Sequence, residues 1–169
     1  GTFTVDGVTY TAPTNSGQWF WSVLNEGDPR FSGGTSEYGG DLNRDGNPAG
    51  SSRLFGVIRE GQRIWVDTDQ DKSFRDETPM QEYAKKFDVQ YLGTDKEATP
   101  VREAVPFVVQ IGKATVGPPE ALVENTYVNI GIVAGAHGSH VAGIAAGKSL
   151  FGGAMSGAAP GAKIISTRA

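Results

Sequence analysis

The chain has 169 residues, of which 38% are hydrophobic and 24 are glycine, a composition typical of a folded, loop-rich domain with its own core. Fifteen basic and nineteen acidic residues give a net charge of -4, which excludes the basic surface of a nucleic-acid-binding protein. No apolar run approaches the roughly 20 residues that span a bilayer, and the absence of cysteine excludes disulfides and thiol chemistry.

The first predicted element is a β-hairpin. Residues 2–5 and 8–11 are rich in β-branched and aromatic side chains, and Asp6-Gly7 lies between them. Asp-Gly favours the two-residue turn that joins antiparallel strands. We therefore expect a hairpin at the start of the chain.

Three aromatic residues follow in succession. Residues 18–24 contain Trp19, Phe20 and Trp21, and they predict a strand that buries two of these rings and exposes the third. A core role is favoured, because aromatic rings supply most of the buried area of a small β-rich unit. The alternative is that the rings line a groove for a ligand.

Residues 32–52 are rich in Gly, Ser, Asn and Asp and predict a loop. Within it, residues 41–47 (Asp-Leu-Asn-Arg-Asp-Gly-Asn) keep the glycine of a calcium-binding loop, but Ser52 occupies its twelfth position. A solvated turn is the favoured interpretation there, and calcium is the alternative. A second hairpin is then predicted for residues 53–59 and 62–67, across Glu60-Gly61.

The second hairpin leads into a carboxylate-rich loop. Acidic residues at every second position can turn hard oxygen ligands toward one Ca²⁺, and two further carboxylates can complete the set. Against calcium, Lys72 stands where the EF-hand loop requires glycine, and Thr78 stands at its twelfth position. A solvated turn built on the aspartate side chains is the alternative for this loop too. The candidate ligands are Asp67, Asp69, Asp71 and Asp76, with Glu77 as a further member.

Later elements are predicted from hydrophobic pattern and turn residues. They are a short helix over residues 80–87, a buried strand over 105–111, a break at Gly117-Pro118-Pro119 and a strand over 127–133. One more strand is predicted over residues 162–167. Strand, helix and strand over 127–167 would then form a right-handed βαβ crossover in a parallel sheet.

His137 opens a segment of small residues. The ten residues after it contain three alanines, three glycines and two β-branched residues, which predicts a short helix that begins near His137. Glycine costs about 1 kcal/mol relative to alanine inside a helix, so only close packing would stabilise it, and we expect the helix to be buried. Since imidazole exchanges protons near neutral pH, His137 is a candidate general base.

The alternative for a single histidine is a core or capping role, and that role is preferred for His140, one turn further on. A zinc site made by both histidines is disfavoured. The zinc helix motif needs a glutamate directly after the first histidine, and Gly138 occupies that place.

Residues 137–143, His-Gly-Ser-His-Val-Ala-Gly, resemble the histidine block of the subtilisin-like serine peptidases, and residues 157–160, Gly-Ala-Ala-Pro, resemble the element that follows it in that family. The resemblance implies peptide-bond hydrolysis by an Asp/His/Ser triad in which His137 is the general base. It also implies an α/β fold, with a partial subtilisin-like parallel-sheet core in residues 127–169. A β-rich insertion domain with acidic loops would precede that core, in residues 1–126.

The other triad members have no convincing match in the chain. Gly34-Thr35-Ser36 precedes His137 and does not continue as the family's serine motif does, and Ser156 lies in a glycine-rich connection. Asp67 follows a hydrophobic strand as the family's aspartate does, but Asp69 replaces the required glycine. We therefore expect a fragment of a larger, tripeptidyl peptidase II-like member, in which a long insertion separates the catalytic aspartate from the histidine.

The predicted function is that of a fragment of a serine peptidase that supplies the general base. Its partners would be a peptide or protein substrate and the remainder of the parent peptidase chain, without nucleic acid or membrane. The isolated chain is expected to be inactive, and secretion is implied by the resemblance alone. The alternative is a non-enzymatic, calcium-stabilised β-rich binding or assembly module, and a metallohydrolase is a third hypothesis. Calcium would be structural, and no catalytic cofactor is expected.

Overall fold

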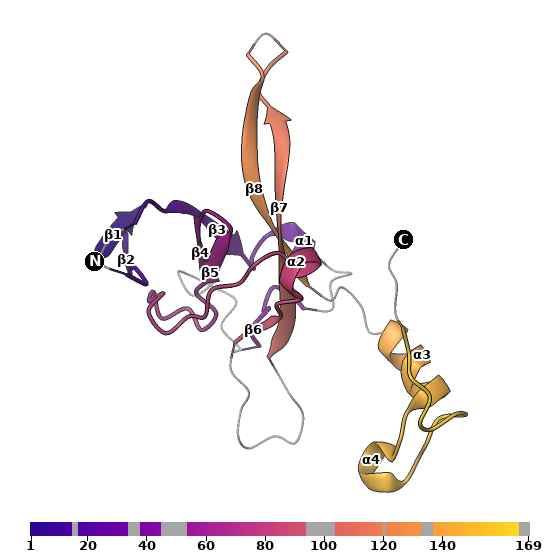
Figure 1. Cartoon of the computed structure of the whole chain (residues 1–169). Coiled ribbons are helices and arrows are strands. Elements are labelled where there is room, and N and C mark those ends of the chain that lie inside the picture. Colours follow the sequence, from indigo (N-terminus) through magenta and orange to yellow (C-terminus); the bar gives the residue numbers. More distant parts are fainter. Residues whose placement is uncertain are drawn as a thin grey trace. The chain divides into compact units, whose positions relative to one another are not determined.

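The computed structural model describes residues 1–14, 17–33, 38–44, 54–93, 104–119, 121–132 and 137–165. The chain forms two compact units, Gly1–Val133 and Ala134–Ala169. Both helices and strands are present and strands dominate (Figure 1). The strands are β1 (Thr2–Val5), β2 (Val8–Thr11), β3 (Phe20–Asn25), β4 (Leu54–Glu60), β5 (Arg63–Val66), β6 (Gln90–Leu92), β7 (Val105–Val116) and β8 (Val123–Ile132). The helices are α1 (Pro29–Ser32), α2 (Tyr83–Lys86), α3 (His137–Ala146) and α4 (Leu150–Gly153).

The N-terminal hairpin forms as predicted. β1 and β2 pair antiparallel, with Val5 opposite Val8. Asp6 and Gly7 make the turn with φ angles of 49° and 78°. Positive φ at both central residues matches the twist of the two strands, and glycine adopts it without steric cost. The Asp-Gly pair therefore sets the register of this hairpin.

The second sheet has the order β3-β4-β5 and is antiparallel throughout. It contains the second predicted hairpin, with Glu60 opposite Arg63. Phe20 is 66% exposed, whereas Trp19 and Trp21 are half-buried. The prediction that two of the three rings pack and one is exposed is confirmed.

The third sheet has the order β6-β7-β8. β6 pairs only with the first three residues of β7, whereas β8 pairs antiparallel with β7 from Phe107 to Val116. The predicted buried strand over residues 105–111 is thus the first part of β7, and the predicted break at Gly117 follows its last residue. The far part of the β7–β8 hairpin has no third strand beside it among the described residues.

Side chains alternate between the two faces of sheet β3-β4-β5, and each face packs against another part of the unit. On one face, Phe55, Val57 and Ile64 pack with residues of the third sheet such as Phe107 and Val109. On the other face, a second cluster joins this sheet to the N-terminal hairpin. That cluster consists of Tyr10, Ile58, Trp65 and Phe74, with Phe3, Val8, Trp19 and Trp21 packed against it. The first unit therefore has three β layers and two cores.

Two helix predictions differ from the structure. Only residues 83–86 of the predicted helix over 80–87 are helical. Met80 instead exchanges two backbone hydrogen bonds with Ile64, at 2.7 and 2.9 Å, which keeps it extended beside β5. α3 begins at His137 as predicted, but none of its residues is buried and Ile144 is 73% exposed. The expectation of a buried helix is therefore wrong for the unit as it stands.

The predicted parallel βαβ crossover is also wrong for the described residues. β8 covers most of the predicted strand over 127–133 and pairs antiparallel with β7. Residues 162–165 are not part of a strand, and residues 166–167 lie outside the described part of the chain. A short turn joins β7 to β8, which permits antiparallel pairing and excludes the long crossover that parallel strands require.

The expected domain boundary between residues 126 and 127 lies inside β8, so the first unit extends beyond it. No described helix is long and apolar enough to cross a membrane.

Candidate functional site

The acidic loop begins with a fully buried aspartate. Asp67 follows β5 directly, has an exposed fraction of 0%, and its backbone N–H donates to the Gly56 carbonyl at 2.8 Å. Its Oδ2 accepts a hydrogen bond from the Lys72 N–H at 3.2 Å. Its Oδ1 is buried and accepts no hydrogen bond from the described residues. Since buried polar atoms are normally paired, this oxygen requires an explanation.

Asp69 and Asp71 lie beside Asp67. One carboxylate oxygen from each of the three residues lies within 4.8 Å of the others. The chain reaches this arrangement through left-handed conformations at Gln70 (φ 62°) and Lys72 (φ 69°). Lys72 thus adopts the conformation for which a calcium-binding loop normally uses glycine. The sequence argument against calcium at this position is therefore weaker than the substitution suggests.

Asp76 and Glu77 do not belong to this group of mutually close oxygens. Asp76 is exposed; burial raises the pKa of Asp69 and of Glu77, and the charge of Asp76 adds a smaller contribution. Glu77 is partly buried and accepts hydrogen bonds from the Thr68 hydroxyl at 2.9 and 3.1 Å, and also from the Thr68 N–H. The predicted ligand Asp76 is therefore outside the cluster. Glu77 is also outside it and stabilises the loop through its hydrogen bonds from Thr68.

Burial, and to a smaller extent like charges, raise the pKa of Asp67, Asp69 and Glu77 in this loop. Burial raises the pKa of Asp67 to about 7, and the charges of Asp69, Asp71 and Glu77 add to the effect, while the hydrogen bond from Lys72 opposes it. Burial likewise raises the pKa of Glu77 to about 7, against the hydrogen bonds from Thr68. Protein groups thus compensate the negative charge of these neighbouring carboxylates only in part.

The donor set of this loop suits a hard cation. Asp67, Asp69 and Asp71 offer only carboxylate oxygens, which Ca²⁺ and Mg²⁺ prefer, and the group contains no histidine or cysteine of the kind that zinc prefers. The second predicted calcium loop, residues 41–47, is described only as far as Arg44, so its ligand set lies partly outside the described residues.

One buried carboxylate was missed by sequence reasoning. Glu26 has an exposed fraction of 0%, and its Oε2 accepts a hydrogen bond from the Leu42 N–H at 2.7 Å. It lies in a turn between β3 and α1, where an acidic residue normally faces solvent. No local pattern in the sequence indicates that it is buried.

The second unit presents the candidate base. His137 is the first residue of α3 and is exposed, as is His140. Residues 134–169 include no Asp or Glu, so this unit cannot itself supply the carboxylate that orients a catalytic histidine. Two serines were considered above as poor matches to the family's nucleophile. Ser156 accepts a hydrogen bond from the Ser149 N–H at 3.3 Å, and Ser36 lies outside the described residues.

The Gly-Ala-Ala segment of residues 157–159 contacts the end of the helix that begins with the histidine block. The backbone N–H groups of Gly157, Ala158 and Ala159 donate to carbonyls of the α3 end, those of Gly147, Ile144 and Ala145, at 2.8, 2.9 and 2.8 Å. A Cβ atom at Gly157 would lie 2.6 Å from the Gly143 carbonyl oxygen, so only glycine permits this approach. The Gly-Ala-Ala segment therefore caps the C-terminal carbonyls of the histidine helix.

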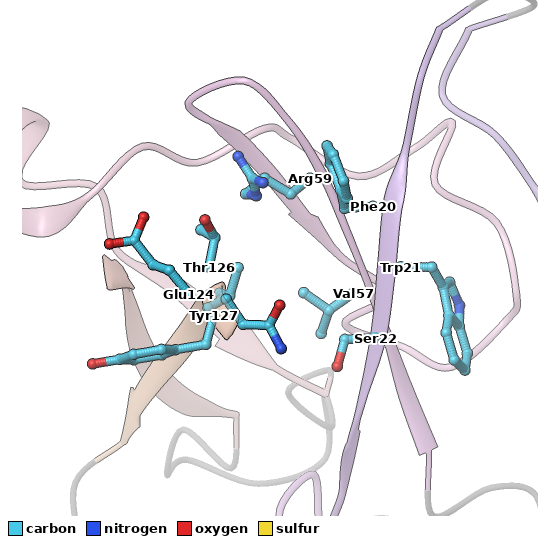
Figure 2. Close-up of a pocket in the computed structure, with 10 residues that line it drawn as sticks. Phe20, Trp21, Ser22, Val57, Arg59, Glu124, Thr126 and Tyr127 are labelled. Atoms are coloured by element: carbon cyan, nitrogen blue, oxygen red, sulfur yellow. The ribbon is translucent and has the colours of Figure 1, made fainter. Parts of the chain in front are cut away.

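A pocket of about 460 Å³ lies in the first unit, between β3 and β4 on one side and β8 on the other (Figure 2). The Arg59 guanidinium lies over the Phe20 ring, 4.7 Å from its centroid. Figure 2 shows Val57 on the same side of β3 as the β8 side chains, while Trp21 points to the opposite side of β3. The β8 residues that line it are Glu124, Asn125, Thr126, Tyr127 and Val128.

Comparison of the chain with family models, with curated proteins and with solved structures finds no match. The site geometry and the short sequence blocks therefore carry the functional argument.

Proposed function

We propose that the second unit supplies the general base, His137, of a subtilisin-like serine peptidase that hydrolyses peptide bonds. The remaining members of the triad would come from the rest of the parent peptidase chain. This proposal concerns the activity of the parent and predicts that the isolated chain hydrolyses nothing, because a general base acts only within hydrogen-bond reach of its nucleophile.

The observation that carries the proposal is the contact between residues 157–159 and the end of the helix that begins with the histidine block. The segment of residues 157–159 caps α3 with three backbone hydrogen bonds, at the opposite end from His137. A helix anchored at its C-terminal end can hold a residue of its first turn in a fixed position while that residue stays open to a substrate. The exposed ring of His137 fits this role.

The proposal also accounts for the exposed apolar side chains of α3. Val141 is 51% exposed and Ile144 is 73% exposed, fractions typical of a surface that another part of a protein covers. In the parent peptidase, the rest of the catalytic domain would cover them. The sequence-based expectation of a buried helix would then hold for the parent.

The test is His137→Ala in the parent peptidase. Loss of the base should lower kcat/KM for a fluorogenic peptide by about 10²- to 10⁴-fold while the circular dichroism spectrum stays unchanged. The matched control is His140→Ala, since this histidine lies one turn further along the same helix and is also exposed. Parent-like activity of the His137 variant would exclude His137 as the base.

A second candidate function is peptide binding by the first unit, and the pocket of Figure 2 favours it. Arg59 offers a cation beside the exposed ring of Phe20, and Tyr127, which is 47% exposed, lines the same pocket from β8. A cation next to aromatic surface suits a carboxylate that follows an apolar side chain, as at the C-terminus of a peptide.

This second candidate is tested with one peptide in two forms, with a free and with an amidated C-terminus. Binding measured by calorimetry should require the free carboxylate and should be lost in Arg59→Gln. Arg63→Gln is the matched control, because Arg63 also lies over an aromatic ring, Trp65, but does not line the pocket. Equal binding of the two peptide forms would contradict recognition of a carboxylate.

A further inference from the structure

The acidic loop contains a buried carboxylate oxygen that has no hydrogen-bond partner among the described residues. The side chain of Asp67 has no exposed surface, and its Oδ1 accepts no hydrogen bond from the described residues. Burying an ionised carboxylate oxygen without a hydrogen-bond donor or a counter-charge is strongly unfavourable. A ligand that supplies positive charge at this atom would remove the penalty.

The three carboxylates of the loop match the dimensions of a cation site. Oxygens that bind one Ca²⁺ lie 2.3–2.6 Å from the ion, so two of them are at most about 5 Å apart. The ligand oxygens of Asp67, Asp69 and Asp71 lie within 4.8 Å of one another. Asp69 and Asp71 are exposed, which gives an ion access to the buried Asp67 from solvent.

We propose that Asp67, Asp69 and Asp71 bind one Ca²⁺. Calcium is preferred over Mg²⁺ because Ca²⁺ accepts irregular sets of six to eight oxygens, whereas Mg²⁺ demands near-ideal octahedral geometry. This inference is independent of the function proposed for His137.

The backbone contacts of the loop show what an ion would stabilise. The Thr11 N–H donates to the Lys72 carbonyl and the Phe74 N–H donates to the Thr11 carbonyl, both at 2.8 Å. Phe74 is fully buried and stacks on Tyr10, with ring centroids 5.8 Å apart. The same loop therefore carries the proposed ligands and joins the N-terminal hairpin to the rest of the unit.

A further hydrogen bond ties the other side of the loop. The Gly93 N–H, directly after β6, donates to the Thr68 carbonyl at 2.8 Å. Bound Ca²⁺ would thus fix a loop that contacts both the N-terminal hairpin and the end of β6. We expect the ion to slow local opening of this region.

The direct experiment is calorimetric titration of CaCl₂ into the full chain after treatment with a chelator. One ion should bind with a Kd of about 1 mM or tighter, the range of weak calcium modules and above. The melting temperature should rise with Ca²⁺ concentration, since a ligand that binds only the folded state stabilises it. Absence of both effects at 10-fold excess over that Kd, roughly 10 mM, would overturn the proposal.

Variants locate the site. Asp71→Asn should weaken binding by about tenfold or more, because ligand charge sets calcium affinity, and the residue is exposed, so the fold should tolerate the change. Asp76→Asn is the matched control, since Asp76 is an exposed carboxylate of the same loop region outside the group of close oxygens. Equal weakening by both variants would reduce the site to nonspecific attraction, and equal heat with Mg²⁺ would overturn the assignment of calcium.

Limited proteolysis tests the structural consequence. Trypsin can cut at Lys72 and Arg75, both exposed in the loop. Ca²⁺ should slow these cuts in the unsubstituted chain but not in the Asp71→Asn variant. Cuts at Lys148 and Lys163 in the second unit serve as the internal control and should keep their rate. Unchanged cutting at Lys72 despite measured Ca²⁺ binding would refute the effect on the loop. None of these measurements uses peptide hydrolysis by this protein, so their failure leaves the test of His137 separate.

Discussion

The two units of the chain use apolar side chains in opposite ways. In Gly1–Val133, large residues such as Phe55, Phe74 and Phe107 are at most 1% exposed. In Ala134–Ala169, none of the described residues is buried, and Phe151 and Ile165 are 81% and 90% exposed. The first unit is therefore stabilised by side-chain burial, whereas the described part of the second depends on backbone hydrogen bonds.

The two units also differ in their charged residues. All nineteen acidic residues lie in the first unit, while the second has three basic residues and no acidic one. A unit that cannot form internal ion pairs and buries little apolar surface has few sources of stability of its own. The comparison teaches that a convincing sequence motif can occur in a segment whose packing requires other parts of a protein.

The largest expected effect tests the burial contrast with one type of substitution in each unit. Phe107→Ala should lower the free energy of unfolding of the first unit by about 3–5 kcal/mol, because it removes a buried ring and leaves a cavity. Phe151→Ala should change the stability of the second unit by no more than about 0.5 kcal/mol. Urea denaturation with tryptophan fluorescence reports on the first unit, where all three tryptophans lie, and amide hydrogen exchange reports on the second.

A large loss of protection in Phe151→Ala would break the comparison. It would mean that Phe151 is packed in solution and that the second unit has a side-chain core after all. An unchanged urea midpoint for Phe107→Ala would also contradict the comparison, because it would mean that burial of this ring does not stabilise the first unit.

An intermediate effect tests how each unit uses a close-packed glycine. A Cβ at Gly56 would lie 2.9 Å from ring atoms of Phe74 and of Tyr10, so Gly56→Ala should cost the first unit about 1–3 kcal/mol through overpacking. Urea denaturation followed by tryptophan fluorescence measures this change. A Gly56→Ala variant as stable as the unsubstituted chain would show that the aromatic cluster can rearrange without cost.

In the second unit, the glycine contact is with the backbone, and its loss should be local. A Cβ at Gly157 would lie 2.6 and 2.7 Å from the carbonyl oxygens of Gly143 and Ile144. Gly157→Ala should therefore abolish the hydrogen-exchange protection of the Ala158 and Ala159 amides. Gly138→Ala is the control, since a Cβ there meets nothing within 4 Å and alanine favours the helix. Retained protection in Gly157→Ala would contradict the capping role of this segment.

Sequence reasoning succeeded where local chemistry decides the structure. Asp6-Gly7 determines its own turn, and alternation along β3 determines that Phe20 faces away from Trp19 and Trp21. The acidic spacing also predicted the group of Asp67, Asp69 and Asp71. These features depend on neighbours within a few residues, so the sequence contains the needed information.

Sequence reasoning failed where distant contacts decide. The mainly apolar residues 127–133 would suit a strand in a parallel or an antiparallel sheet, and the antiparallel pairing of β8 is decided by its partner β7. Spacing alone could not show that Asp76 lies outside the oxygen group, because the direction of a loop side chain depends on the backbone around it. The left-handed conformation of Lys72 contradicts the glycine rule, and the burial of Glu26 has no local signal.

The smallest expected effect concerns the exposed part of the first unit, which resembles the second unit in depending on backbone pairing. Lys113 and Glu124 form an ion pair of 2.7 Å across the β7–β8 hairpin, with side chains 66% and 62% exposed. Water screens such a pair, so Glu124→Gln should cost no more than about 0.5 kcal/mol in urea denaturation. A loss above about 1 kcal/mol would exceed the range of exposed ion pairs. It would mean that side chains, and not the ten paired positions of the two strands, hold the hairpin together.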